Sequence, residues 1–225
     1  ESLDLNWKIL EESDLQAMGA GALLAVGQGS RTPPRLIVID YPGQDPQAKP
    51  LVVIGKAITF DTGGYSLKDR AGMVGMKFDK CGGADVLGLI QAAAEMNLPE
   101  RIVGIIAAAE NMVSAEAYRP KDIIISLSGK TVEIISTDAE GRLVLADALT
   151  YARQNYQPRA MIDLATLTGG VVIALGSVRA GLMSNDEGLA DALMAAGERT
   201  RERLWGLPLD DDYFDLIKGE DSDLR

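Results

Sequence analysis

The stretch from Ser136 to Leu149, STDAEGRLVLADAL, combines a dense group of charges with a long apolar run. Asp138, Glu140 and Arg142 fall within its first half, and the second half consists of good helix formers interrupted only by Asp147. This pattern predicts a charged loop that leads into a buried helix. If the loop is extended, the three charged side chains point the same way, because side chains in extended chain repeat every two residues.

The charged loop has two interpretations. In the simpler one, Asp138 caps the helix, Glu140 occupies its favoured first turn, and Arg142 pairs with one of them. In the other, the three ionic groups beside a buried helix hold a metal ion or an anion. The stretch alone leaves both interpretations open, and a second ionic cluster favours the latter.

The second cluster lies upstream, around a strand that otherwise has the composition of a fully buried one. Lys56 is embedded in this apolar run, Asp61 follows at its end, and Asp79 precedes the next predicted helix. Each residue has a structural explanation, as an ion pair for the first two and a helix cap for the third. Together they fit better as ligands, because sites in α/β sheets form at the carboxyl ends of strands.

Charge compensation connects the two clusters. Asp61, Asp79, Asp138 and Glu140 carry four negative charges, which a protein core cannot hold without compensation. Two divalent cations would balance them. Lys56 can join the ligands only as a neutral amine, so we expect burial beside cations to lower its pKa.

Lys68 and Arg142 remain as positive charges available to anions that develop during a reaction. Two-metal hydrolases use such an arrangement, in which cations about 3.5–4 Å apart activate a bridging water and polarise the scissile carbonyl. Ligation by carboxylates without imidazole or thiolate accepts Mn²⁺ and Mg²⁺ as well as Zn²⁺.

The composition excludes several other classes of protein. The 225 residues carry a net charge of −11, which argues against generic binding to nucleic acid or to an anionic membrane. There is no histidine, so Ser–His and Cys–His catalysis and His-ligated zinc are excluded within the chain. A single cysteine and the lack of a membrane-length apolar run or signal peptide indicate a cytoplasmic protein. Because the chain starts without methionine and stops just after a charged segment, we expect a fragment of a longer protein.

Strand and helix patterns alternate along the chain. The fold class they indicate is α/β, as a three-layer α/β/α sandwich around a mixed, largely parallel sheet, with 1–225 forming a single domain. Strands are predicted at 35–41, 51–60 (interrupted at Gly55-Lys56), 101–109, 160–164 and 178–184, helices at 13–18, 79–97, about 141–156 and 187–204, and a hairpin over 122–135.

Three rival motifs are weaker. The sequence FDTG at 60–63 invites an aspartic protease interpretation, but it occurs once, and the chain is too helical for that class. Neither a phosphate-binding G-x-x-x-x-G-K-[ST] loop nor a dinucleotide-binding G-x-G-x-x-G motif is present.

Three ordered segments carry a specific resemblance. They are 53–68 (VIGKAITFDTGGYSLK), 76–88 (MKFDKCGGADVLG) and 136–149, and they resemble the signature blocks of the leucyl aminopeptidase family, peptidase family M17. The resemblance implies that the chain is part of that family's catalytic domain, without its N-terminal domain and without the final part of the catalytic domain.

The resemblance also implies roles for individual residues. One metal ion is expected on Lys56, Asp61, Asp79 and Glu140, and the other on Asp61, Asp138 and Glu140. Lys68 and Arg142 correspond to the catalytic pair: the lysine polarises the substrate carbonyl or stabilises the tetrahedral oxyanion, and the arginine holds a bicarbonate that serves as general base. Such a base suits a chain without histidine. Substrate-binding positions are expected at Met76, Thr166, Leu167, Thr168 and Gly169, for which core packing and a tight turn are the structural alternatives.

The implied function is hydrolysis of the N-terminal residue, with a leucine-like preference, from peptides with a free N-terminus. The cofactors expected are two Zn²⁺ or Mn²⁺ ions, with Mg²⁺ also tolerated, and bicarbonate as auxiliary base. The full-length protein is expected to be a homo-hexamer. The alternative from another class is a non-catalytic, structural or DNA-architectural member of the same family, which degenerate ligands would indicate; all five are intact here.

Overall fold

The computed structural model describes residues 5–225, which divide into two compact units. The first comprises the chain up to Thr166 together with Gly219–Arg225, and the second comprises Leu167–Lys218. Each unit is described by itself below.

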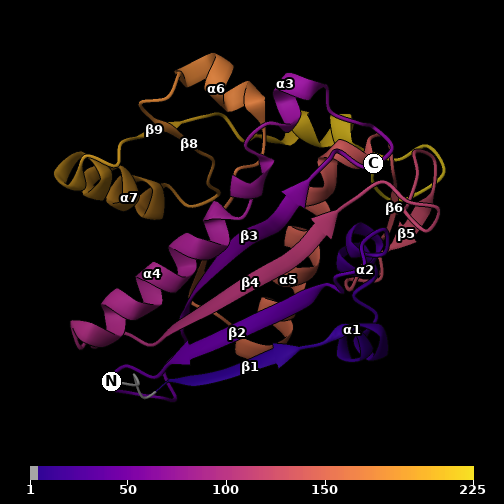
Figure 1. The fold of residues 1–225 in the computed structure, drawn as a ribbon. Helices are drawn as coiled ribbons and strands as arrows, with labels where there is room; N and C mark the ends of the chain where they lie inside the picture. The colour runs from indigo at the N-terminus through magenta and orange to yellow at the C-terminus, as the bar shows by residue number, and fades with distance from the viewer. Residues whose placement is uncertain (1–4) are drawn as a thin grey trace. The chain divides into compact units, whose positions relative to one another are not determined.

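The first unit is built on a five-stranded sheet with the strand order β1-β2-β4-β3-β7 (Figure 1). The strands are β1 Asn6–Leu10, β2 Arg35–Tyr41, β3 Leu51–Asp61, β4 Ile102–Asn111 and β7 Ala160–Leu164. β2 is antiparallel to both of its neighbours, whereas β4, β3 and β7 pair in parallel, so four of the five strands run in one direction. The mixed, largely parallel sheet expected from the sequence is therefore confirmed.

Helices cover both faces of this sheet. They are α1 Glu12–Met18, α2 Gly21–Gly27, α4 Cys81–Glu95 and α5 Glu140–Tyr156. A further short helix, α3 Arg70–Met73, buries none of its residues. α4 packs on one face, where Val86, Ile90 and Ala93 meet apolar residues of β3 and β4. α1, α2 and α5 bury their apolar residues against the other face. The result is the predicted three-layer sandwich (Figure 1).

Asp147 is the one charge within the apolar run of α5, and its carboxylate binds backbone N–H groups of two other segments. Its carboxylate accepts hydrogen bonds from the backbone N–H of Leu23, at 2.9 Å, and of Leu127, at 2.8 Å. The first of these lies in the opening turn of α2, where N–H groups lack partners within the helix. Burial raises the pKa of Asp147 and the backbone hydrogen bonds oppose that rise.

α4 approaches β3 and β7 so closely that glycine is required at the contacts. A Cβ on Gly82 would lie 1.9 Å from the carbonyl oxygen of Leu164, and one on Gly55 would lie 2.4 Å from the carbonyl oxygen of Gly82. β3 passes through Gly55 and Lys56 without a break. The interruption predicted at these residues is therefore wrong, because the glycine serves helix packing instead of ending the strand.

A small hairpin and the chain's last residues complete the first unit. β5 Ile123–Ile125 and β6 Thr131–Glu133 are antiparallel, as predicted but shorter. Leu224 forms a parallel bridge with Val132, and its carbonyl oxygen accepts a hydrogen bond from the N–H of Glu133 at 2.8 Å. The segment 219–225 thus extends this hairpin.

The second unit is small. It contains α6 Gly169–Leu175, β8 Ala180–Leu182, α7 Glu187–Thr200, β9 Leu204–Gly206 and a 3₁₀ helix at Asp211–Ile217. β8 and β9 are parallel, and the guanidinium of Arg179 lies 5.5 Å from the centre of the Trp205 ring. α7 ends four residues before the predicted Leu204 because Arg201 adopts a left-handed conformation, with φ of 69°.

Several predicted boundaries differ from the observed ones. β1 was not expected, and Glu11, not Ser13, is the N-cap residue of α1. The helix predicted from residue 79 begins at Cys81, after a 3₁₀ turn at Met76–Phe78. Within residues 5–225, none of the helices has both the length and the apolar character that crossing a bilayer requires.

Candidate metal centre

Three carboxylates from distant parts of the sequence meet at the carboxyl end of β3. Asp61 ends this strand, Asp138 lies in a 3₁₀ turn at Thr137–Ala139, and Glu140 begins α5. Each offers an oxygen atom, and these atoms all lie within 4.8 Å of one another. Asp79 follows the 3₁₀ turn before α4, and Lys56 lies between it and Glu140, in contact with both. We call Asp61, Asp79, Asp138 and Glu140 the carboxylate cluster.

Lys56 is buried between two members of the cluster. Its Nζ lies 2.8 Å from Oε1 of Glu140 and donates to Oδ1 of Asp79 at 2.9 Å. A third hydrogen bond, at 3.1 Å, goes to the carbonyl oxygen of Thr166. An ammonium group has three N–H donors, so all three are used.

Lys68 connects the other two members. Its Nζ lies 2.9 Å from Oδ2 of Asp61 and 2.5 Å from Oδ1 of Asp138. The sequence interpretation leaves Lys68 over as a positive charge once two divalent cations balance the four acids, and that role stays a prediction. Each lysine thus bridges a different pair of carboxylates.

Burial and the neighbouring charges shift the pKa values of the side chains in this cluster. Burial would lower the pKa of Lys56, but the carboxylates of Glu140 and Asp79 outweigh it and raise that pKa. The fall in the pKa of Lys56 is expected only beside bound cations, and it stays a prediction. Burial raises the pKa of Glu140 to about 7, with Lys56 acting in the opposite direction. Burial also raises the pKa of Asp79, against hydrogen bonds from Lys56 and Thr166.

The donor set fits divalent cations. Four carboxylates face two ammonium groups, so the acidic groups of the cluster outnumber the cations that the chain itself supplies. Oε2 of Glu140 is buried and has no hydrogen-bond partner among residues 5–225, so a ligand oxygen is available. Oxygen-rich sites of this kind suit Mg²⁺, Mn²⁺ and Zn²⁺.

Arg142 follows Asp138 and Glu140 along the chain, and the sequence predicts that all three side chains point the same way if this segment is extended. That expectation assumed an extended loop, whereas Thr137–Ala139 is a 3₁₀ turn and α5 starts at Glu140. Glu140 is 2 % exposed, whereas Asp138 and Arg142 are both exposed. Within the described part of the chain, Arg142 forms no hydrogen bond or ion pair, so its guanidinium is available to an anion.

The predicted substrate-binding residues fall in both units. In the first, Met76 begins the 3₁₀ turn before Asp79, and the Thr166 hydroxyl donates to Oδ1 of Asp79 at 2.7 Å. Leu167, Thr168 and Gly169 belong to the second unit, where the Thr168 hydroxyl accepts from the N–H of Gly170 at the start of α6. These positions remain predictions as substrate contacts.

The sequence interpretation missed two buried residues that hold the cluster together. Thr137 is fully buried, and its hydroxyl donates to the carbonyl oxygen of Gly63 at 2.6 Å and accepts from the N–H of Ser66 at 2.8 Å. Asn111, at the end of β4, donates to Oδ1 of Asp61 at 2.8 Å. The available signal was a polar residue at the carboxyl end of an apolar run, the same signal that identified Asp61.

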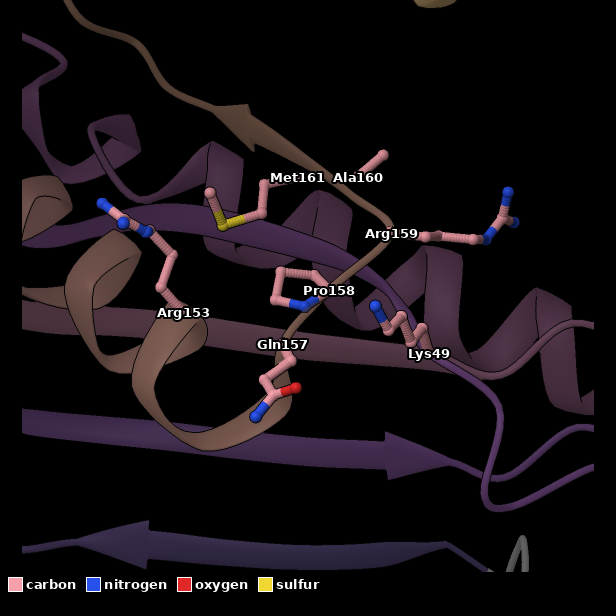
Figure 2. Close-up of a pocket in the computed structure, with 7 residues that line it drawn as sticks. All are labelled: Lys49, Arg153, Gln157, Pro158, Arg159, Ala160 and Met161. Atoms are coloured by element: carbon pink, nitrogen blue, oxygen red, sulfur yellow. The ribbon is translucent and has the colours of Figure 1, made fainter.

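A surface hollow of about 390 Å³ lies away from this cluster (Figure 2). It includes Ala160, which pairs with Leu51 at the opposite end of β3 from Asp61. Ten residues of strand separate those ends, a distance on the order of 30 Å. Its cationic side chains do not converge, since Arg153 and Arg159 are directed to opposite sides (Figure 2). No carboxylate of the residues that the structure describes lines it.

Comparison with known proteins gives a consistent family match. Residues 1–225 match the family described as "Cytosol aminopeptidase family, catalytic domain". Three similar curated proteins are each named "Probable cytosol aminopeptidase". One from Syntrophotalea carbinolica is 54 % identical over 221 residues, which cover 98 % of this chain and 44 % of that protein. One from Cenarchaeum symbiosum is 50 % identical over 217 residues, which cover 96 % of this chain and 44 % of that protein.

The third, from Nitrosococcus oceani, is 49 % identical over 224 residues, which cover 100 % of this chain and 44 % of that protein. The chain therefore spans less than half the length of these curated relatives.

Proposed function

The chain belongs to the cytosol aminopeptidase family of peptidases, and we propose that it carries the active centre of a two-metal aminopeptidase. The proposed reaction is hydrolysis of the N-terminal residue, with a leucine-like preference, from peptides that have a free α-amine. The observation that supports it most directly is the carboxylate cluster, in which three oxygens lie within 4.8 Å and two lysines bridge the carboxylates in pairs.

The residues that would hold the two cations are Lys56, Asp61, Asp79, Asp138 and Glu140. Bound divalent cations supply Lewis-acid polarisation of the scissile carbonyl and lower the pKa of water. For Lys56 to act as a ligand its amine must lose a proton, which the raised pKa of this lysine opposes until a cation neutralises its carboxylate neighbours.

Lys68 is the proposed stabiliser of negative charge on the substrate oxygen. Its pKa is raised by hydrogen bonds to Asp138 and Asp61, which outweigh the effect of burial, so the side chain stays cationic near neutral pH. Its side chain is 17 % exposed, so it remains in reach of a molecule entering from solvent. A fixed positive charge beside a developing oxyanion lowers the activation barrier.

Arg142 is the proposed holder of the auxiliary base. The planar guanidinium binds a carboxylate-like anion through two parallel N–H bonds. A bicarbonate held this way could accept the proton of the attacking water, a task that otherwise needs a side chain such as histidine. Location in the cytosol and a homo-hexameric assembly of the complete gene product are part of the same proposal.

The test is hydrolysis of a leucine anilide by the complete gene product, with and without a chelator. We expect chelation to abolish cleavage and Mn²⁺ to restore it. Lys68→Ala should lower kcat about 10²–10³-fold, the usual effect of removing one oxyanion-stabilising group. Asp138→Ala should abolish metal-dependent cleavage.

Lys49→Ala is the matched control, because this exposed lysine lies just before β3, at the end of the strand far from Asp61. It should retain wild-type activity. Cleavage that persists in protein shown to be metal-free would contradict the proposal. A folded, metal-loaded protein without peptidase activity would favour the non-catalytic alternative.

A further inference from the structure

Asn111 is fully buried at the end of β4, next to the carboxylate cluster but not part of it. Its side-chain Nδ2 donates to Oδ1 of Asp61 at 2.8 Å and to the carbonyl oxygen of Thr137 at 3.0 Å. Both partners are acceptors, so the amide nitrogen must face them, and the orientation of the amide is fixed by its surroundings. Asn111 therefore contacts one predicted ligand and the residue that precedes another, Asp138.

The main chain of Asn111 also forms hydrogen bonds to the loop that follows Asp61. Its carbonyl oxygen accepts from both the N–H of Thr62, at 3.0 Å, and the hydroxyl of Thr62, at 2.8 Å. The residue thus fixes the loop after Asp61 through its backbone and the Asp61 carboxylate through its side chain. The position is 0 % exposed, so a bulkier side chain would strain it.

These contacts restrict the rotation of the Asp61 carboxylate. Oδ1 accepts from Asn111 and from the N–H of Gly63, both at 2.8 Å. With Oδ1 held by two neutral donors, Oδ2 faces the Nζ of Lys68 at 2.9 Å, the ammonium that also contacts Asp138. An amide suits this place better than a carboxylate, which would set acceptor against acceptor and add a further negative charge.

We propose that Asn111 is a positioning residue of the metal centre, whose amide sets the orientation of Asp61 and its spacing from Asp138. The inference rests on the proposed two-metal function. Hydrogen-bond partners of metal ligands orient those ligands, and their loss usually costs 10–100-fold in metal affinity or activity. Ligands already held in place also lose less conformational freedom when a cation binds.

The test compares Asn111→Ala with Tyr118→Phe in the complete gene product. The Tyr118 hydroxyl donates to the same carbonyl oxygen of Thr137, at 2.8 Å, but has no hydrogen bond to Asp61. The phenylalanine variant therefore removes one anchor of Thr137 and leaves the Asp61 contact intact. The readouts are the Kd for Mn²⁺, measured by titration of the chelator-treated protein, and kcat and KM for a leucine anilide at low and saturating Mn²⁺.

We expect Asn111→Ala to raise the Kd for Mn²⁺ about 10–100-fold, and Tyr118→Phe to raise it less than about threefold. Cleavage by Asn111→Ala should be lost at low Mn²⁺ and recover in kcat at saturating Mn²⁺, with KM near the wild-type value. A purely structural role would lower the unfolding temperature of the metal-free protein without changing the Kd, and that result would overturn the proposal.

Asn111→Ser provides a second variant, because its hydroxyl finds backbone partners locally but is too short to replace the amide. If neither Asn111 variant folds while Tyr118→Phe does, Asn111 is a structural residue and the proposal fails. If the wild-type protein binds Mn²⁺ and cleaves the anilide while Asn111→Ala has the same Kd, only this inference fails. If the wild-type protein does neither, the proposed function fails with it.

Discussion

Oε1 of Glu140 lies 2.8 Å from Nζ of Lys56, and both side chains are almost completely buried, with 2 % and 3 % of their surfaces exposed. Nζ also lies 2.9 Å from Oδ2 of Asp79. The lysine therefore compensates charge on two elements at once, the start of α5 and the segment before α4. Removing it would leave buried carboxylates without a counter-charge.

Lys56→Met keeps most of the volume of the side chain and removes its charge. In metal-free protein we expect the free energy of unfolding to fall by about 3–5 kcal/mol, the usual cost of breaking a buried ion pair. Saturating Mn²⁺ should recover part of that loss if cations can compensate the carboxylates that remain. Urea denaturation with chelator and with Mn²⁺ measures both values.

Lys49→Met is the control, because it changes the same residue type at an exposed position and should alter stability by less than about 0.5 kcal/mol. A Lys56→Met protein as stable as this control would show that the buried pair contributes nothing to folding.

Thr137→Val tests the connection between the turn that carries Asp138 and the loop that follows Asp61. The substitution keeps the shape of a fully buried side chain but removes the hydroxyl that bonds the carbonyl oxygen of Gly63 and the N–H of Ser66. Because these backbone groups would be left without partners, we expect a loss of about 1–3 kcal/mol in the free energy of unfolding. We also expect weaker binding of Mn²⁺, measured by titration of metal-free protein.

The matched control is Thr150→Val in α5, where the hydroxyl donates to the carbonyl oxygen of Ala146 within the same helix at 2.8 Å. That acceptor already belongs to the helix ladder, so a change of less than about 1 kcal/mol and an unchanged Kd for Mn²⁺ are expected. Equal effects of the two substitutions would argue against a special role for Thr137.

Much of the fold follows from local pattern. The strands at 35–41 and 160–164 were predicted with both ends correct, because apolar or β-branched runs flanked by turn residues leave little ambiguity. β1 was missed, since all but the last of its five residues are exposed and it lacks the apolar pattern of the buried strands. Its pairing with β2 comes from tertiary structure, which local propensity does not encode.

The candidate site was predictable in part for a similar reason. Asp61 was identified as a charged residue at the end of a predicted strand. Asp79 and Glu140 were identified as acidic residues at the beginnings of predicted helices. The pairing of Lys68 with Asp61 and Asp138 depends on how three loops fold together. The role of Asn111 likewise depends on β4 lying beside β3, which no single stretch of sequence specifies.

Gly82→Ala and Gly88→Ala test the close approach of α4 to the sheet. A Cβ at Gly82 would lie 1.9 Å from the carbonyl oxygen of Leu164, whereas a Cβ at Gly88 meets nothing within 4 Å. Since backbone would have to move, Gly82→Ala should lower the free energy of unfolding by about 2–3 kcal/mol or more. Gly88→Ala, in the same helix, should raise it by up to about 1 kcal/mol through better helix propensity. Chemical denaturation of the two variants measures these free energies. A Gly82→Ala protein as stable as the wild type would contradict the close approach of α4 to the sheet.

The segment 219–225 should detach from β6 in acid before the central sheet unfolds. The Asp223 carboxylate accepts from the N–H and the hydroxyl of Thr131, both at 2.8 Å, and these bonds lower its pKa from the ordinary 3.8. A hydrogen bond from Lys121, together with backbone hydrogen bonds from Glu220 and Asp221 in this segment, lowers the pKa of Glu133 from 4.5. A lowered pKa in the folded state means that stabilisation is complete above the ordinary pKa and is lost as the pH falls through the lowered value.

Hydrogen exchange between pH 7 and pH 3 measures this effect at the N–H of Leu224, which donates to the carbonyl oxygen of Thr131 at 3.1 Å. Its protection should fall below about pH 4 while that of Val53, in the central strand β3, persists. Asp223→Asn should expose the Leu224 amide already at neutral pH, because the amide side chain lacks the charge that strengthens the bonds to Thr131. Protection of Leu224 that stays as high as that of Val53 throughout the acid range would show that these carboxylates do not hold the segment in place.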